Sequence, residues 1–367
     1  MTEKYKIKIF YKIDEEIENI WLSLENRNRK NITIFQTLNW QKKWIENIGD
    51  KTGVLSIIFV EKLSDNSKLL IPMIINSKNF INVLQFTGYP FSDFNLSIGD
   101  NTFDYKDIEI IFELILRKNI INRRIDVIKL INQPENIFGV KNPIYNIDFL
   151  KIRENISYKI QTNLILEKDI LMKKENKFLK QDYYRIEKKI KNLNFRICQS
   201  YNEKKKIIDF ISNKKSEQYK RNNTLDLFSN KYYKDFFESF IENNNINLSY
   251  IYIDKKILAA HYGFIYENIF YYIFPVYDFS EKHLSPGNLL LYRLINNYLD
   301  KVNFFDFTVG GEKYKKKWSN YNVKMTDNLK ILNARGFLYL IYIKLLKILS
   351  SNQKIKNFLK YIYIKFK

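Results

Sequence analysis

Three apolar runs follow one another in the second half of the chain with only short separations. They span Leu248–Ile253, Ile257–Ile265 and Ile269–Val276. The separating residues, Asp254-Lys255-Lys256 and Glu267-Asn268, are natural hairpin turns. The sequence therefore predicts an antiparallel meander at this position.

Helical and extended patterns around this meander occur in a similar order in both halves. The second half is expected to contain the helices 204–221, 232–242 and 286–299 and the strands 158–166, 195–198 and 304–307. The first half is expected to contain the helices 14–27, 38–48 and 105–117 and the strands 5–11, 54–60, 69–75, 83–86 and 125–131. The repeat is one of topology, without internal sequence identity. The expected fold class is α/β (α+β), with a mixed, mostly antiparallel sheet flanked by helices in each half.

The organisation predicted from these patterns has three parts. An N-terminal domain spans residues 1–150, a C-terminal domain spans 151–330, and a tail covers 331–367. The stretch Asn132–Asn146 contains Pro134 and Pro143 and is the expected boundary region. At 367 residues, about two domains are expected.

The composition leaves few side chains for chemistry. A single cysteine, Cys198, cannot form an internal disulfide and fits a reducing compartment. Thiolate zinc sites need several cysteines, and His261 and His283 are too far apart for the HExxH motif, so we expect no metal. Catalysis must then use carboxylates, Tyr, Lys, Ser and backbone amides.

The net charge of +21 is not by itself a sign of nucleic-acid binding. Only 11 of the 61 basic residues are Arg, the residue best suited to base and phosphate recognition. The abundance of Lys, Ile and Asn fits an AT-rich genome. A Lys-rich helix is expected from Ile170 to Lys191, either as a solvated face or as an RNA-binding face. Nucleic acid is thus not expected as a partner, except for tRNA under the alternative below.

The end of the chain is basic and amphipathic. After Asp327 no acidic residue occurs, whereas nine bases are interleaved with Leu, Ile, Phe and Tyr. Such a helix either contacts an anionic membrane surface or packs on the body of the protein with a solvated basic face. The sequence carries no secretory signal and no apolar run of transmembrane length. A cytoplasmic protein is expected, with the tail providing any contact with the inner face of the membrane.

Ser285-Pro286-Gly287-Asn288 opens the helix that follows the meander. Ser285 is a plausible N-cap, and Pro286 suits the first helical turn. Gly287 would let a ligand approach the free amides, where the positive end of the helix dipole favours a diphosphate. The alternative is a plain capped helix, because this tetrapeptide lacks the spacing of either glycine-rich nucleotide motif.

The surrounding residues resemble a known family. Ala259-Ala260-His261, Tyr277-Asp278, Ser285-Pro286-Gly287 and the run FDFTVGGEKYKKKW from Phe305 to Trp318 are similar to the CelD-type acetyltransferases of the GNAT superfamily. Gly311 stands where that family usually has Asp. Residues 158–320 carry the resemblance, and FQTLNWQKKWIENIG and FTGYPFSDFN extend it into the first half. The whole layout is similar to tandem-GNAT proteins, including Fem-type aminoacyltransferases.

The resemblance implies acyl transfer from acyl-CoA, with acetyl-CoA as the expected co-substrate. Ser285, Pro286, Gly287 and Asn288 would hold the donor, and Lys315 would add positive charge. Tyr314 would protonate the departing thiolate, and Asp306 or Glu312 would act as base. His261 is a further candidate base, and Asp93 would line the acceptor cleft. For three of these residues a structural role is the alternative: a hydrogen bond to a loop for Asp306, a place in the core for His261 and an Asx turn for Asp93.

Three functions are compatible with these features. The favoured one is an acyltransferase that acts on an amine or hydroxyl of a sugar, polysaccharide or lipid precursor. The second is a Fem-like transferase that takes its acyl group from aminoacyl-tRNA and modifies a cell-wall precursor. The third is a non-catalytic scaffold that docks on the membrane through residues 337–367.

Overall fold

One large sheet runs through both halves of the molecule. The computed structural model describes residues 4–78, 80–162 and 192–351, and the predicted helix at 170–191 lies outside them. Within these ranges, eleven strands are hydrogen-bonded in the order β12-β13-β14-β15-β16-β11-β17-β8-β6-β5-β2. The strands of the second half are β12 (Leu193–Ile197), β13 (Ile246–Ile253), β14 (Lys256–Tyr266), β15 (Ile269–Tyr277), β16 (Phe304–Val309) and β17 (Tyr321–Ile331). Those of the first half are β2 (Gly53–Leu55), β5 (Met73–Lys78), β6 (Ile81–Phe86), β8 (Val127–Pro134) and β11 (Leu150–Gln161).

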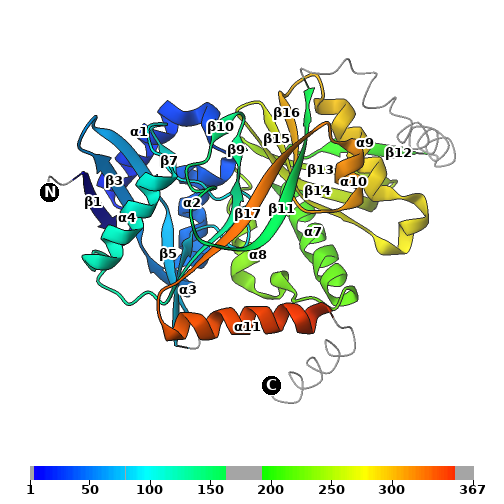
Figure 1. The fold of residues 1–367 in the computed structure, drawn as a ribbon. Coiled ribbons are helices and arrows are strands. Elements are labelled where there is room, and N and C mark those ends of the chain that lie inside the picture. The colour runs from blue at the N-terminus through cyan, green and yellow to red at the C-terminus, as the bar shows by residue number, and fades with distance from the viewer. Residues whose placement is uncertain (1–3, 79, 163–191, 352–367) are drawn as a thin grey trace.

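The two halves exchange their last strands. β11 ends the first half but lies between β16 and β17 of the second, and β17 in turn pairs with β8 of the first half (Figure 1). The predicted division at residue 150 instead counts β11 with the second half, between whose strands it lies. The stretch 132–146, expected to be a boundary, contains the end of β8 and a small hairpin, β9 (Asn136–Ile137) with β10 (Val140–Lys141).

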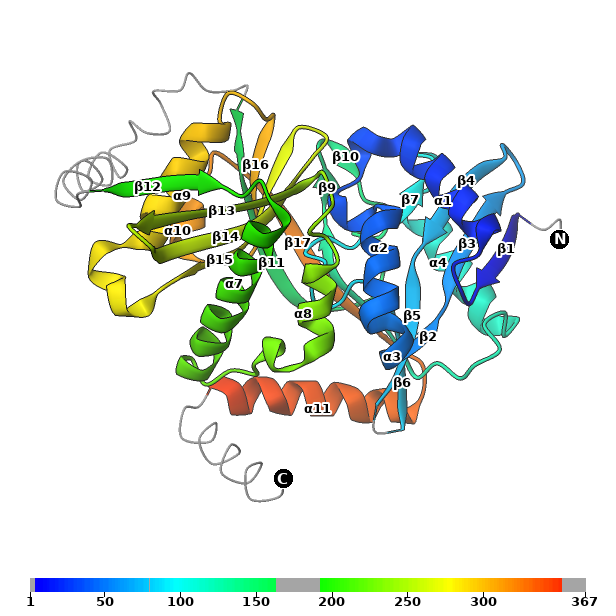
Figure 2. The ribbon, with the colours of Figure 1, turned by 180° about the vertical axis from the view of Figure 1, so that it is seen from behind.

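Helices cover the sheet on both faces. α1 (Glu15–Asn28), α2 (Leu38–Trp44), α7 (Tyr201–Arg221) and α8 (Lys231–Glu238) lie together in front of it in Figure 2. Their side chains share one core across the halves, in which the Trp40 ring lies 5.2 Å from the ring of Phe236. α9 (Pro286–Tyr298) packs on the opposite face. The predicted mixed, mostly antiparallel sheet with flanking helices is confirmed.

Local sequence signals explain several element boundaries. The hydroxyl of Thr37 accepts a hydrogen bond from the amide of Trp40 and so caps α2. The helix expected at 38–48 continues beyond that range, because a π-helical turn, Ile45–Gly49, carries it into α3 (Asp50–Thr52). Glu267 and Asn268 both adopt positive φ angles and join β14 to β15. The predicted meander is therefore confirmed.

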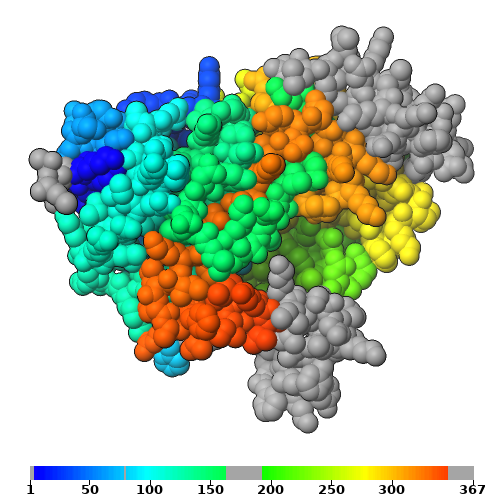
Figure 3. Space-filling model, in the orientation of Figure 1, coloured from blue at the N-terminus to red at the C-terminus, as the bar shows by residue number. Residues whose placement is uncertain are grey.

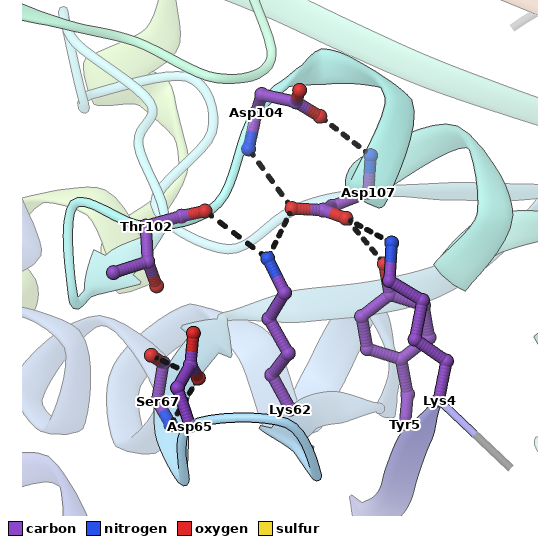
Figure 4. A network of polar contacts seen from close by, with 8 residues as sticks. All are labelled: Lys4, Tyr5, Lys62, Asp65, Ser67, Thr102, Asp104 and Asp107. Atoms are coloured by element: carbon purple, nitrogen blue, oxygen red, sulfur yellow. Dashed lines mark hydrogen bonds and ion pairs between the residues drawn. The ribbon is translucent and has the colours of Figure 1, made fainter.

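A smaller sheet completes the first half. It has the order β1-β3-β4-β7, formed by β1 (Tyr5–Phe10), β3 (Ile57–Lys62), β4 (Ser67–Ile71) and β7 (Ile98–Gly99). Asp107, in the first turn of α4 (Tyr105–Arg117), accepts hydrogen bonds from Lys4, Tyr5 and Lys62 and ties this helix to β1 and β3 (Figure 4). Burial acts to raise the pKa of Asp107, but these hydrogen bonds outweigh it and hold the pKa well below its usual range.

α11 (Ala334–Ser351) runs along the lower edge of the molecule in both ribbon views (Figures 1 and 2). Its inner side packs through Leu340 against Val83, Val127 and Leu329. Five large apolar residues on it remain exposed by 40% to 61%: Phe337, Leu338, Ile341, Tyr342 and Leu345. In the space-filling view, the helix borders a hollow that green and yellow segments of the second half enclose (Figure 3). The helix therefore packs on the body and still presents an apolar surface.

Candidate functional site

The site begins where two parallel strands separate. β15 and β16 pair only from Ile269 to Tyr271, opposite Phe304 to Asp306, and diverge beyond these residues. A cavity of about 420 Å³ opens there between the second half of β15, the start of α9 and the segment after β16. Seven of the ten residues predicted as functional line it: Ser285, Pro286, Gly287, Asn288, Glu312, Tyr314 and Lys315.

The start of α9 has no side-chain cap, and one backbone amide there is free to donate a hydrogen bond. Ser285 adopts a left-handed conformation, with φ of 48°, and its side chain makes no capping hydrogen bond, so the predicted N-cap role is wrong. Pro286 has no amide hydrogen, and the amide of Asn288 donates to the carbonyl of Ser285 at 3.0 Å. In the described part of the chain, the Gly287 amide has no acceptor and remains available to a ligand.

Positive side chains surround this amide. Five bases line the cavity against one acid, Glu312: they are Lys214, Lys215, Arg221, Lys282 and Lys315. Arg221 and Lys282 both lie on the ring of Phe279, at 3.8 and 4.8 Å from its centroid, which fixes their position. Burial lowers the pKa of Lys215 to about 8. The cavity therefore attracts an anionic ligand.

The bases on α7 were not identified from the sequence. Lys214, Gln218 and Arg221 recur at spacings of four and three residues, so they share one face of a predicted helix. That spacing was the only sequence signal for these residues, and it indicates a shared helix face. The structure shows what the face contacts, because it places α7 at the cavity together with β15 and α9.

Lys315 is held in place by its own loop. Its ammonium group donates to the carbonyl of Val309 at 2.8 Å and forms an ion pair with Glu312 at 3.0 Å. Tyr314, the preceding residue, is partly buried beside Phe307. Burial, together with the charge of Glu312, raises the pKa of the Tyr314 phenol, which therefore stays protonated at neutral pH and can donate a proton.

Asp93 reaches the site from the first half. Its neighbours in the chain anchor it there: the Phe91 ring lies 4.8 Å from that of Phe237, and the Phe94 ring lies 4.5 Å from the ammonium group of Lys159. Asp93 itself interacts with Thr308 and Lys315. Burial raises the pKa of its carboxyl group to about 6, although Lys315 opposes this shift. The loop of one half thus delivers a carboxyl group to the cavity region of the other.

Asp306 has partners that leave it little freedom to act as a base. It is fully buried, pairs with the ammonium group of Lys159, and accepts a hydrogen bond from the amide of Thr308 at 2.7 Å. A β-bulge lies here, because three residue steps of β16 match two of β11, and Thr308 adopts a φ of 59°. The arrangement matches the structural alternative considered for Asp306, and we infer that its role is to position Thr308.

His261 lies beneath the cavity wall rather than in it. Its ring stacks on Tyr272, with centroids 4.5 Å apart, and fills the space above Gly263. Burial lowers its pKa to about 3, so the imidazole is neutral at physiological pH. Neither ring nitrogen has a polar partner among the described residues. The structure therefore does not bring His261 together with the other candidates.

Comparison with known proteins agrees with this geometry. Residues 177–316 match the family model of the acetyltransferase (GNAT) domain. This segment is an acyltransferase domain. It contains α7, the meander, α9 and the segment that carries Tyr314 and Lys315, which are the elements that build the cavity. No group of residues suited to a metal ion occurs among those that the structure describes.

Solved structures share the architecture of the whole chain. FemX is similar with a TM-score of 0.58 and 10% identity, over 92% of this chain and 99% of that chain. A conserved protein of unknown function from Bacteroides thetaiotaomicron has a TM-score of 0.52 and 11% identity, over 89% of this chain and 100% of that chain. L-PGS from Bacillus licheniformis has a TM-score of 0.51 and 12% identity, over 89% of this chain and 96% of that chain. At this identity the likeness concerns the fold alone, and it extends over both halves of the chain. No curated protein sequence matches this chain.

Proposed function

We propose that the protein transfers an acyl group from acyl-CoA to an amine or hydroxyl of a sugar, polysaccharide or lipid precursor. The observation that carries this proposal is the cavity between β15 and β16, which is lined by five bases and by Gly287, whose amide has no acceptor among the described residues. A diphosphate fits this combination, because both a helix start and basic side chains favour negative charge. Acetyl-CoA is the donor that we propose, in line with the CelD-type resemblance.

The proposed reaction assigns one step to each side chain. The acceptor attacks the thioester carbonyl, the new C–N or C–O bond forms, and the C–S bond breaks. Asp93 takes the proton of the nucleophile, directly or through water. Lys315 stabilises the developing oxyanion, and Tyr314 protonates the thiolate. Glu312 holds Lys315 in place through their ion pair.

Donor binding can be tested by calorimetry with acetyl-CoA. Lys282→Ala removes a cavity base and is expected to raise the Kd about tenfold, which corresponds to roughly 1.4 kcal/mol. Lys301→Ala is the matched control, because Lys301 is exposed in the same half and does not line the cavity. An equal Kd for the wild type and the cavity variant would refute the site.

Aminoacyl-tRNA is the alternative donor, and the same basic cavity would suit its phosphates. The two donors differ in how binding depends on salt. Affinity for tRNA would fall steeply between 50 and 200 mM salt, because many phosphate contacts release counterions. A strong salt dependence of tRNA binding, with acyl transfer from aminoacyl-tRNA and none from acetyl-CoA, would favour this alternative.

We also propose that α11 rests on an anionic membrane surface. Its five exposed apolar residues would insert at the interface, while Arg335 and Lys344 would face the lipid headgroups. Among the described residues, no helix has the length and apolarity needed to cross a bilayer. The proposed contact is therefore peripheral.

Vesicle sedimentation of the full chain tests this contact. Vesicles of phosphatidylglycerol and phosphatidylcholine should retain the protein, and those of phosphatidylcholine alone should retain much less. Replacing Leu338, Tyr342 and Leu345 together by Ser should abolish retention. Leu225→Ser is the control and should not, because Leu225 is 79% exposed but lies outside α11. A dimer in solution that the triple variant dissociates would show that a second copy covers this surface instead.

A further inference from the structure

The first half contains a second cavity, of about 630 Å³. It lies between the end of α1, the segment before α4, the first residues of α4, and the β9–β10 hairpin with the residues after it. No residue of the proposed acyl-transfer machinery lines it. Its volume is within the range of small-molecule sites.

The position of this cavity corresponds in part to that of the donor cavity in the second half. Each half has a parallel strand pair whose strands flank a helix: β6 and β8 flank α4, and β15 and β16 flank α9. Each cavity is lined by the end of another helix (α1 or α7), the segment before the flanked helix, the start of that helix, and residues after the second strand. The cavities differ in that β15 lines the first, whereas neither β6 nor β8 lines the second.

The features that suit the donor cavity to phosphate are missing here. The carboxylate of Asp104 already accepts a hydrogen bond from the amide of Asp107 at 2.9 Å, so the start of α4 is occupied by its own side chain (Figure 4). Asp107 in turn accepts from the amide of Asp104. Asp100 adds a second acidic group to the lining, against a single base, Lys141. The lining therefore offers an anion no excess of positive charge.

Neutral polar groups take the place of the bases. Asn31, Ser97, Asn101 and Asn146 line the cavity, and none has a hydrogen-bond partner recorded in the described part of the chain. Asn142 differs, because its amide group is bonded to Gln133, Pro134 and Ile144 and serves the fold. Amide and hydroxyl side chains both donate and accept, which matches ligand hydroxyl groups.

Apolar side chains and one aromatic ring line the cavity beside these polar groups. Ile32, Leu69, Leu96 and Phe103 are buried at the cavity wall, and Tyr105, the first residue of α4, is 38% exposed beside them. Pockets that combine apolar walls with a few placed polar groups are typical of small-molecule sites. We propose that this cavity binds a neutral, hydroxyl-rich ligand, that is, a saccharide.

The experiment uses the full chain and calorimetric titration with glucose, galactose, N-acetylglucosamine and their trisaccharides. At least one of these probes should bind. Tyr105→Ala should weaken that binding about tenfold or more, equivalent to roughly 1.4 kcal/mol. Tyr201→Ala is the matched control, because Tyr201 is also the first residue of a helix and is 52% exposed, but lies outside the cavity. The paired variant Asn101→Ala with Asn146→Ala should act as Tyr105→Ala does.

Two further titrations distinguish binding in this cavity from binding at the donor site. Saturating CoA should leave the saccharide Kd unchanged, and Lys282→Ala should weaken CoA binding while leaving saccharide binding intact. Glucose 6-phosphate should bind more weakly than glucose. The proposal is overturned if none of the probes binds, if CoA displaces them, if the phosphorylated sugar binds more tightly, or if Tyr201→Ala weakens binding as much as Tyr105→Ala. Each of these results leaves the acyl-CoA proposal open to its own test.

Discussion

Asp93 lies close enough to Lys315 and Glu312 for their charges to influence its carboxyl group, and its environment disfavours the ionised form. Its folded-state pKa of about 6 lies above the ordinary value of 3.8, so the folded protein favours the protonated form. The burial that raises this pKa therefore destabilises the ionised protein above pH 6. A carboxyl group with such a pKa is well matched to proton abstraction near neutrality.

Asp93→Asn should therefore lose activity and gain stability. We expect turnover to fall at least about 100-fold, as for the loss of a general base. The melting temperature should rise at pH 7.5, and this gain should disappear as the pH falls below about 4, where both states are protonated. Rate measurements and thermal unfolding over pH 4–8 would check both effects. Wild-type activity should itself decrease as the pH falls through 6.

Asp148→Asn provides the control, since Asp148 is an exposed carboxyl group in the same half. It should change neither turnover nor melting temperature. A lower melting temperature of Asp93→Asn at pH 7.5 would mean that Asp93 supports the fold, as in the Asx-turn alternative.

For the ion pair of Lys159 and Asp306 we predict an effect on stability, because both side chains are almost fully buried. Removing one partner leaves the other charge uncompensated in the interior. Asp306→Leu should therefore cost about 3–5 kcal/mol in free energy of unfolding. Adding Lys159→Met should restore much of this loss, and urea denaturation of the three variants would measure it. If the double variant is as unstable as Asp306→Leu, the charge on Lys159 is not the cause.

Among the elements, the turn between β16 and α10 (Lys313–Trp318) controls the position of Lys315. Gly310 has a φ of 143°, and a β-carbon at this position would lie 2.2 Å from Glu312 Oε2 and 2.6 Å from Lys315 Nζ. A side chain there must therefore displace the ion pair. The adjacent Gly311 has nothing within 4 Å of an added β-carbon.

Gly310→Ala should therefore reduce both acyl transfer and stability, the latter by about 1 kcal/mol or more. Gly311→Ala should leave both nearly unchanged and serves as the matched control. Gly311→Asp restores the residue usual in the CelD-type family and should fold equally well. Steady-state rates and urea denaturation distinguish the positions. Equal effects of the two alanine substitutions would contradict the assigned role of the Gly310 turn.

The sequence predicts those elements whose signals are local. The turns of the meander follow from Asp254 and Glu267-Asn268, and the start of α9 follows from Pro286. The left-handed Ser285 and the bulge at Thr308 are not predictable in this way, because no local residue pattern marks them and the bulge arises in the pairing of β16 with the distant β11. The helical spacing of the α7 residues predicts that they share one face, but long-range packing, which a single sequence does not reveal, placed that face at the cavity.

At the scale of the whole molecule, the exchanged strands make the halves interdependent. β8 of the first half pairs with β17, and β16 of the second half pairs with β11. Either half alone would lack a strand of its sheet. The core shared by α1, α2, α7 and α8 adds to this dependence.

We therefore expect a single unfolding transition for the whole chain. Three of the four Trp residues lie in the first half, so fluorescence reports mainly on that half, whereas far-UV circular dichroism reports on both. The two urea curves should coincide, as they do for a cooperative two-state transition. Separate midpoints would show that the halves unfold as independent domains, with the predicted division near residue 150.

The exchange of strands also sets an order for synthesis on the ribosome. β8 is complete once residue 134 has been added, but its neighbour β17 ends at residue 331. At about 5–20 residues per second, the nascent first half waits roughly 10–40 seconds with an open sheet edge. Such an edge invites pairing with other chains. Slow translation of the second half should therefore lower the yield of native protein, and chaperones that shield nascent chains should raise it.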